Sequence, residues 1–278
     1  MSVFFCIRPA PPLDAMVEHL WASDRPALMH ARERSLPTGC ADIVIPLLQT
    51  HLIRHDDDSD ASPQRLREPV LQGACDRYLV RGGTAEPSSV VGVHFKPGGV
   101  ALFAGVPMGD LNNLTVTLDS LWGAAASELR GQLLALPDTG ARLAWLERWL
   151  LARLTHRGPA PDAAVLWAAR QFDRRPPPAR VDTIRAATGL GPARFIERFR
   201  DTIGLTPKRY ARVRRLQAVL QQAAAPGPVD WAALSLDAGF ADQAHLSREF
   251  RRMTGSTPGS YRPVAPSQPN HVAIPGPA

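Results

Sequence analysis

The sequence has few cysteines, few aromatic residues and no long apolar run. Its three cysteines (Cys6, Cys40 and Cys75) form no CxxC pair and no Cys/His cluster with zinc-ligand spacing. We therefore expect reduced thiols in a cytoplasmic protein. No apolar run reaches the roughly 18 residues that a membrane-spanning helix needs. The first residues lack a basic segment before their short apolar patch, so they do not predict a secretory signal.

Common enzyme motifs are also missing. The turn Lys96–Gly99 (KPGG) lacks the GK[ST] ending of a phosphate loop, and no Ser/His/Asp set is evident. His51 and the acidic run His55–Asp60 could bind a metal, but a solvated loop is the simpler interpretation. Nothing links these residues to His94, the other histidine of the expected strands and loops. We predict no catalytic residue, no metal and no cofactor, and hence no enzyme.

What remains is a globular composition with uneven charge. The 278 residues are 45% apolar and 21% charged, enough for one large domain or two ordinary ones. Residues 161–263 hold 17 Arg/Lys against 9 Asp/Glu, whereas the rest holds 15 against 17. A basic C-terminal half favours a polyanionic partner such as nucleic acid, although a solubilising surface would have the same composition.

The N-terminal part predicts strands followed by helices. Short apolar stretches at Ala41–Leu48, Tyr78–Val80 and Val90–Phe95 are separated by turns, which indicates a sheet or barrel up to about residue 118. In Ala141–Leu154, leucines recur at steps of three and four, so we expect a helix with one apolar face. That face packs on its own domain or also pairs with another subunit.

Breaks in the pattern divide the chain into three parts. The Pro/Gly-containing stretch Thr155–Pro161 predicts a linker. It separates an N-terminal domain (residues 1–157) from a C-terminal domain (161–263). Residues 264–278 are proline-rich, and we expect a disordered tail.

An internal repeat carries the functional prediction. Residues 195–210 (FIERFRDTIGLTPKRY) align with residues 246–261 (LSREFRRMTGSTPGSY) at an offset of 51, with six identities in sixteen positions. Glycine and proline are among the identities. We interpret the segments as copies of one supersecondary unit.

The second copy predicts two helices around a tight turn. Asp230 suits the N-cap of a helix over residues 231–238, and Gly239 ends it. Asp242 suits the N-cap of a second helix over residues 243–253. This is helix-turn-helix spacing, in which the second helix can enter the DNA major groove.

The first copy predicts the same arrangement. Asp182 suits the N-cap of a helix over residues 183–188, Gly189 breaks it, and Pro192 begins the second helix. Residues 207–223 form one long helix between the copies. Such a helix spans roughly 25 Å, so it could hold two recognition helices about one DNA turn, roughly 34 Å, apart.

The residues around the second copy resemble the DNA-binding domain of the AraC/XylS family of bacterial transcription regulators. The resemblance covers about residues 161–263 and rests on residues 239–250 (GFADQAHLSREF), followed by Gly255, Thr257-Pro258 and Tyr261-Arg262. It implies an all-α domain of seven helices, in which a long helix joins two helix-turn-helix units. Two departures from the family are Glu197, where an arginine is frequent, and the small Ala193.

The N-terminal part resembles a sensor domain found in some of these regulators. The matching stretches are Leu36–Cys40, Val91–Gly99 and Leu118–Gly123. The resemblance implies a cupin-like β-barrel with trailing helices, and hence a two-domain α+β protein. It also implies RNA polymerase and a second copy of the chain as partners.

Candidate DNA-binding residues lie on the second helix of each copy. Gln243 and Arg248 are the best candidates for base reading, because Gln pairs bidentately with adenine and Arg with guanine. Ala244, Ser247 and Glu197 fall on or near the same faces. His245 contacts DNA or packs beside Leu246. Phosphate contacts, or a solvated basic face, are expected of the remaining candidates: Arg194, Arg198, Arg251 and Arg252.

Three hypotheses follow. The first is a sequence-specific regulator that binds double-stranded DNA and is controlled by a small-molecule effector in the N-terminal domain. The second is a barrel enzyme with an accessory DNA-binding domain. In the third, the N-terminal half of a DNA-binding protein only mediates dimers, and it would then show no ligand-dependent change in melting temperature.

Overall fold

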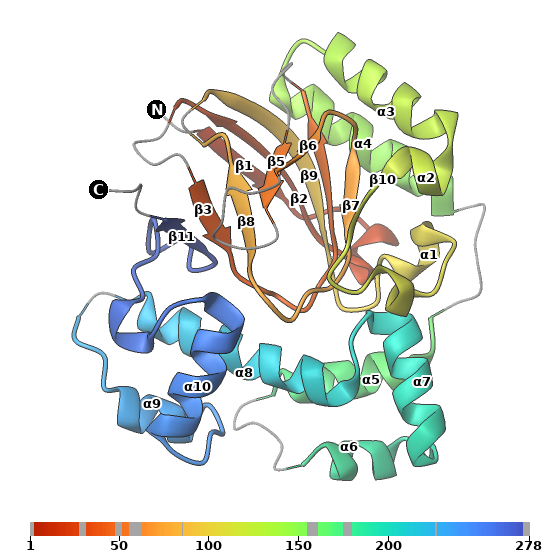
Figure 1. Ribbon diagram of the computed structural model, residues 1–278. Helices are drawn as coiled ribbons and strands as arrows, with labels where there is room; N and C mark the ends of the chain where they lie inside the picture. Colours follow the sequence, from red (N-terminus) through yellow and green to blue (C-terminus); the bar gives the residue numbers. More distant parts are fainter. Residues whose placement is uncertain are drawn as a thin grey trace.

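The computed structural model describes residues 3–27, 32–47, 52–55, 63–84, 86–154, 161–174, 180–225 and 227–274. A β-rich N-terminal domain lies above a helical C-terminal domain in Figure 1. The two-domain α+β prediction is confirmed. The acidic residues 56–62 and the linker residues 155–160 lie outside the described residues.

The described strands form two antiparallel sheets. One has the order β1 (Val3–Ile7), β2 (Val17–Arg25), β9 (Ser88–Phe95), β4 (Asp42–Pro46), β7 (Val70–Gln72), β10 (Thr115–Thr117). The other has the order β11 (His271–Ile274), β3 (Arg32–Ser35), β8 (Leu79–Gly82), β5 (Leu52–His55), β6 (Gln64–Leu66). Where a barrel is expected, the pairing of the described strands gives two open sheets.

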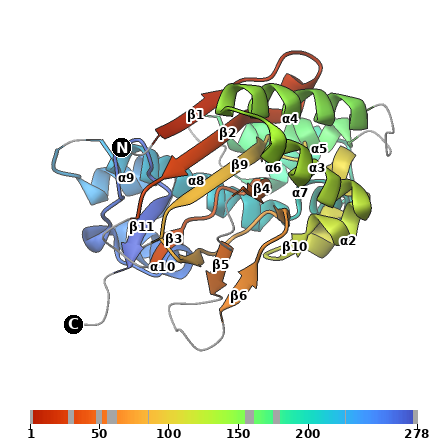
Figure 2. The same cartoon turned by 90° about the horizontal axis from the view of Figure 1, so that it is seen from above.

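Helices cover one face of the six-stranded sheet (Figure 2). The short helices are η1 (Leu13–Ala15), α1 (Ala101–Ala104), η2 (Met108–Leu111) and α2 (Leu118–Trp122). The longer ones are α3 (Ala124–Ala135) and α4 (Thr139–Leu154). Leucines of α4 share a buried core with Val93 and Phe95 of β9, so the predicted apolar face packs on its own domain.

The C-terminal domain is all-α, as predicted. Its helices are α5 (Ala163–Phe172), α6 (Val181–Ala187), α7 (Pro192–Ile203), α8 (Pro207–Ala223), α9 (Trp231–Asp237), α10 (Gln243–Thr254) and the short η3 (Pro258–Ser260). The Thr206 hydroxyl accepts a hydrogen bond from the Arg209 backbone and caps α8. The expected Asp182 cap is wrong. Arg180 is the N-cap residue of α6, and Asp182 lies in its first turn, where it favours the helix dipole.

The tail does not follow the expectation of disorder. Residues 271–274 form β11, which pairs antiparallel with β3 of the N-terminal domain. Val272 and Ile274 are buried. Without β11, the backbone N–H and C=O groups along one edge of β3 would be unpaired, and β11 forms hydrogen bonds with them. The alternation of buried and partly exposed residues in β11 is only four residues long and follows a proline-rich stretch. Composition alone therefore predicts a disordered segment.

We expect Val272→Asp to lower the free energy of unfolding by roughly 2–4 kcal/mol, because it places a carboxylate in an apolar site or releases the strand. Gln268→Asp, at an exposed position of the same tail, serves as the control. Urea unfolding of the two variants measures the effect. Equal stability of both variants would show that β11 is not held in solution.

Candidate nucleic-acid interface

The second helix-turn-helix unit consists of α9 and α10. The Asp230 carboxylate accepts hydrogen bonds from the backbone N–H groups of Ala232 (3.0 Å) and Ala233 (3.1 Å), which fixes the start of α9. Gly239 has φ 79°, in the left-handed region that favours glycine, and it turns the chain between the helices. The Asp242 carboxylate accepts from the His245 backbone N–H at 2.6 Å and starts α10.

Buried apolar residues hold α10 in place. Leu246, Phe250 and Met253 are fully buried in the helical core. The Phe250 ring makes edge contacts with Trp231 (6.1 Å between centroids) and Tyr261 (5.7 Å). One face of α10 therefore packs on the helical core, and the opposite face is exposed to solvent.

The outward face of α10 carries most of the predicted DNA-binding residues. The exposed ones are Gln243, Ala244, Arg248, Arg251 and Arg252, while His245 and Ser247 are half-buried. The His245 ring packs edge-on against Phe240 at 5.4 Å. The Arg252 guanidinium is 3.3 Å from the Glu249 carboxylate and 3.8 Å from that of Asp76.

The first unit, α6 and α7, has the same design. Phe195 and Phe199 are buried, and their rings pack together at 5.6 Å between centroids. Arg194 and Glu197 are exposed. Arg198 is half-buried, and its Nη1 donates to the Asp162 carboxylate at 2.7 Å. Because Asp162 also caps α5, this arginine connects two helices of the domain.

Ile196 of α7 is not among the candidate DNA-binding residues that the sequence predicts. Ile196 is 49% exposed, in the middle of the outward face between Arg194 and Glu197. The sequence does contain an indication of this exposure, because Ile196 does not lie on the helix face formed by the buried residues Phe195, Phe199 and Ile203. An apolar side chain on this face can contact a thymine methyl group.

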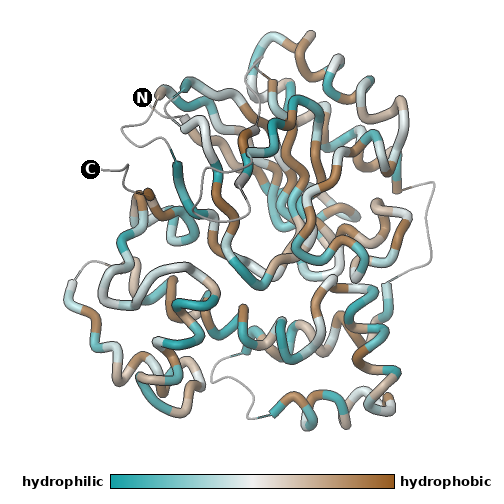
Figure 3. The backbone as a smooth tube through the Cα atoms, in the orientation of Figure 1, coloured by the Kyte–Doolittle hydropathy of each residue, from teal (hydrophilic) through white to brown (hydrophobic). Residues whose placement is uncertain are grey.

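Helix α8 determines the spacing between the two helix-turn-helix units. Its 17 residues run between them, and α7 and α10 lie toward its opposite ends (Figure 1). Tyr210, Val213, Leu216 and Leu220 of α8 are buried. Figure 3 shows hydrophobic and hydrophilic stretches alternating along the helical domain, as expected of helices with one buried face.

The N-terminal domain contacts α8 through ionic hydrogen bonds. Arg209 donates to both carboxylate oxygens of Asp76, from Nε at 2.8 Å and from Nη2 at 3.3 Å. Arg209 Nη1 donates to the Asn112 side chain at 3.0 Å. Asn113 also donates to Asp76, at 3.0 Å. We call Asp76, Arg209, Asn112 and Asn113 the interdomain cluster.

Backbone carbonyls of a second loop hold the middle of α8. Arg214 Nη1 donates to the Thr38 carbonyl at 3.0 Å, and Gln217 Nε2 donates to the Pro37 carbonyl at 2.8 Å. Leu36 and Ala74 of the N-terminal domain join the apolar core of the C-terminal helices. One apolar cluster therefore spans the contact between the domains, separate from the main core of the β-rich domain.

Both helix-turn-helix units touch the N-terminal domain as well. The Arg200 side chain of α7 packs against the backbone of Gly109, where a Cβ would lie 2.8 Å from it. Gly255 ends α10 with φ 71°, and a Cβ there would lie 2.8 Å from the Tyr78 ring. Glycine is needed at Gly255 for both reasons. The positions of α7 and α10 thus depend on the N-terminal domain.

Two ionic clusters lie in the β-rich domain. Burial would raise the pKa of Glu33, but Arg81, His271 and Arg25 together hold it well below its ordinary range. Burial would likewise lower the pKa of His94. The Asp42 carboxylate, 2.7 Å from His94 Nδ1, outweighs it and raises that pKa well above its ordinary value.

The His94 pair predicts a pH dependence of stability. The raised pKa means that the folded state favours the imidazolium, so its contribution is complete below about pH 6.5 and is lost as the pH rises through the folded pKa. Unfolding free energies of the wild type and His94→Gln, measured from pH 6 to 9, should converge as the pH rises. His19 stacks on His94 at 5.0 Å and has a lowered pKa, because of burial and the His94 charge, so its own contribution has the opposite sign. A constant difference between the two proteins would contradict the pairing.

Within the ranges described, no three His, Cys, Asp or Glu side chains come close enough together to hold a metal ion. None of the described helices has the length and apolar character needed to cross a membrane. The C-terminal domain offers two exposed helical faces, on α7 and on α10. Both carry arginine side chains, and α10 adds the amide of Gln243.

Comparison with known proteins agrees with this geometry. Residues 184–263 match the model of a helix-turn-helix domain family, and residues 6–117 match a domain of unknown function (DUF6597). The second match coincides with the segment predicted to be β-rich. No curated protein matches the sequence significantly.

Several solved structures of ToxT from Vibrio cholerae are similar to the chain. ToxT from strain O395 has 10% sequence identity and a TM-score of 0.46, with 86% of this chain and 95% of that chain covered. The unsaturated-fatty-acid-bound ToxT from strain SCE256 has 12% identity and a TM-score of 0.45, with 86% and 92% covered.

The duplicated unit and the matched domains define a class: a two-domain DNA-binding protein with a helix-turn-helix domain behind a β-rich domain. More closely, the C-terminal domain is a helix-turn-helix domain whose duplicated unit resembles that of the AraC/XylS family.

Proposed function

We propose that the chain reads an operator through α7 and α10 in successive major-groove segments, and that a small-molecule effector in the N-terminal domain controls this binding. The observation that carries the proposal is the pair of exposed faces at the two ends of α8, fixed from behind by buried aromatic residues. Gln243 and Arg248 would read bases from α10. On α7, Ile196 would contact a thymine methyl group and Glu197 a cytosine amino group.

Phosphate contacts would come from the basic residues around these faces. Arg194 and Arg251 are exposed and suited to this role. Arg198 would first have to leave Asp162, and Arg252 would have to leave Glu249 and Asp76. DNA binding would then compete with the Arg252–Asp76 contact, which crosses between the domains.

Genome-wide recovery of bound DNA, followed by footprinting of the purified full chain on the recovered sites, tests the proposal. We expect two protected major-groove segments about one helical turn, 10–10.5 base pairs, apart. Protection of a single segment would remove α7 from base reading. An absence of any enriched site would reject sequence-specific binding.

Three further assignments are part of this proposal. A homodimer is supported by the edge strand β1, on which Phe4 and Phe5 are exposed. RNA polymerase as a partner and action in the bacterial cytoplasm rest on the resemblance of the C-terminal domain to the AraC/XylS family. Sedimentation of the wild type against the Phe4→Ser/Phe5→Ser double variant tests the dimer, which we expect the double variant to lose.

A further inference from the structure

Cys40, Asp42 and His94 form a cluster at one end of the six-stranded sheet. Asp42 of β4 is paired with His94 of β9, so their side chains lie on the same face of the sheet, and Cys40 comes two residues before Asp42. His94 Nδ1 is 2.7 Å from the Asp42 carboxylate. The imidazole also makes a hydrogen bond with the Cys40 side chain. We call these three residues the thiol cluster.

The thiol cluster favours the reactive form of Cys40. Burial would lower the pKa of His94, but Asp42 and Cys40 together raise it well above its ordinary value, so the imidazole carries a positive charge beside the sulfur. The thiolate is the nucleophilic form of cysteine, and a neighbouring cation stabilises it. A carboxylate that orients an imidazole next to a nucleophile is also the arrangement of catalytic triads.

The other two cysteines have different surroundings. Burial raises the pKa of Cys75 to about 12, and its Sγ donates a hydrogen bond to the Gly73 carbonyl at 3.2 Å. Partial burial raises the pKa of Cys6 on β1 as well. Both thiols therefore keep their protons at neutral pH, and we expect them to react more slowly than Cys40.

A buried hydroxyl group of α8 lies next to Cys40. Tyr210 is fully buried, and within the described ranges its Oη has no hydrogen-bond partner. The ring packs on Gly39, where a Cβ would lie 3.2 Å from it, and a charge on Cys40 is close enough to act on the hydroxyl. Burial raises the pKa of Tyr210 well above its ordinary value, so the hydroxyl remains a donor. An oxygen atom added to the Cys40 sulfur would give this donor an acceptor.

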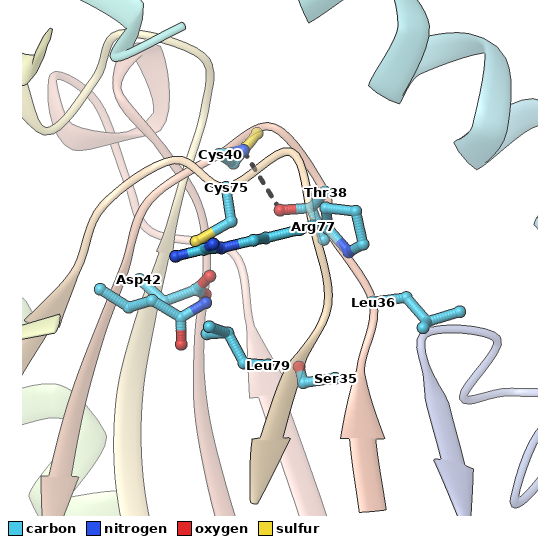
Figure 4. A pocket seen from close by; sticks show the side chains of 10 residues that line it. Ser35, Leu36, Thr38, Cys40, Asp42, Cys75, Arg77 and Leu79 are labelled. Carbon is cyan, nitrogen blue, oxygen red and sulfur yellow. Dashed lines mark hydrogen bonds between the residues drawn. The ribbon is translucent and has the colours of Figure 1, made fainter. Parts of the chain in front are cut away.

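A small polar cavity gives access to Cys40. Its volume is about 30 Å³, and residues of the segments 35–42 and 72–79 line it, Cys40 and Cys75 included. Figure 4 shows both cysteines among the lining side chains, with Thr38 beside Cys40. A water molecule needs about 10–15 Å³ on this measure, so the cavity admits a molecule of two or three heavy atoms. Hydrogen peroxide, with two oxygen atoms, is of this size, whereas a branched alkyl hydroperoxide is larger.

We propose that Cys40 is oxidised by hydrogen peroxide to a sulfenic acid. The thiolate sulfur attacks one oxygen atom of the peroxide, so that an S–O bond forms as the O–O bond breaks and two electrons pass from sulfur to the peroxide. The second oxygen leaves as hydroxide and takes a proton from the His94 imidazolium, which gives water. Asp42 holds the imidazole in place, and the Tyr210 hydroxyl donates to the new oxygen. This modification site is separate from the DNA-binding faces of α7 and α10.

Labelling of the full chain with dimedone, which reacts with sulfenic acids, tests the proposal. After treatment with hydrogen peroxide, peptide mass spectrometry should find the dimedone adduct first on Cys40. Cys75→Ser is the matched control, because it removes the other thiol of the cavity and with it a partner for a disulfide. Cys6→Ser removes the thiol on β1, and both variants should keep the Cys40 adduct. Faster labelling of Cys6 or Cys75, or no Cys40 adduct in the wild type and in Cys75→Ser, overturns the proposal.

The rate of labelling tests the part played by His94. His94→Gln should lower the rate on the order of 10-fold or more, because an adjacent opposite charge favours the ionised form of a group by about one to three pKa units. His19→Gln is the control, since it removes the imidazole that stacks on His94 at 5.0 Å, and it should react at nearly the wild-type rate. Melting temperatures establish that each variant folds. Equal rates in the wild type and in His94→Gln overturn the thiol cluster.

The size of the oxidant tests the route through the cavity. The rates with hydrogen peroxide and with tert-butyl hydroperoxide are each divided by the rate of the same oxidant with free cysteine. We expect Cys40 to discriminate strongly against the larger oxidant, because it does not fit the cavity. Equal relative rates would show that the oxidant arrives by another path and overturn the assignment of hydrogen peroxide.

Discussion

Arg248→Ala is expected to lower the affinity for the operator about 5- to 150-fold and to leave non-specific DNA binding almost unchanged. A bidentate contact from arginine to guanine contributes roughly 1–3 kcal/mol of discrimination, which corresponds to this loss. Arg248 is exposed on α10 and makes no ion pair or hydrogen bond among the described residues, so its removal should not disturb folding. Fluorescence anisotropy with operator and unrelated DNA, at one salt concentration, measures both affinities.

Arg67→Ala is the matched control, because it also removes one exposed arginine but lies in the N-terminal domain. It should bind both DNAs as the wild type does. If Arg248→Ala keeps the operator footprint, Arg248 contacts phosphate or solvent, and the selectivity comes from other residues of α10 or from α7.

Asp76→Ala is expected to loosen the contact between the domains. The Asp76 side chain is only 4% exposed and receives hydrogen bonds from Arg209 and Asn113. Hydrogen bonds to charged groups contribute about 1.5–3 kcal/mol. Because the Arg209 side chain is 42% exposed, solvent compensates part of this loss, and we expect a drop of about 1–2 kcal/mol in the free energy of unfolding.

Hydrogen exchange and DNA affinity distinguish docking from simple destabilisation. In Asp76→Ala, backbone amides of residues 36–42 and 73–78 should exchange faster, and DNA affinity should rise because Arg252 is released. Asp110→Ala, at an exposed position of η2, provides the control on the same side of the domain. Unchanged exchange in Asp76→Ala would show that the shared apolar core alone holds the domains.

Local signals explain why the C-terminal domain can be predicted from its sequence. Asp230, Asp242 and Thr206 form the expected caps, and Pro192 begins α7 as expected. Each of these effects involves residues within one turn of a helix, so the chain order itself contains the information. The Asp182 cap is the exception, since α6 begins two residues earlier than its sequence suggests.

Long-range contacts explain what the sequence does not reveal. Asp76 and Arg209 are 133 positions apart, and neither is among the residues that the two copies of the repeat share. The small polar cavity lined by residues of the segments 35–42 and 72–79 exists only because two loops from different strand pairs meet at one end of the sheets. Likewise β11 is a strand only because β3 has a free edge beside it. No periodicity or cap indicates such features, because each depends on a surface built by distant residues.

The return of the chain to the N-terminal sheet limits how far the DNA-binding helices can travel. After Tyr261 only nine residues (262–270) lead to β11, and fully extended they reach about 30 Å. While β11 stays paired with β3, the domains can separate only by a limited rigid-body movement. The segment 262–270 and the linker before α5 are the two covalent connections that restrict it. The DNA-binding half then remains at high local concentration beside the sheets and can dock again quickly once DNA is released.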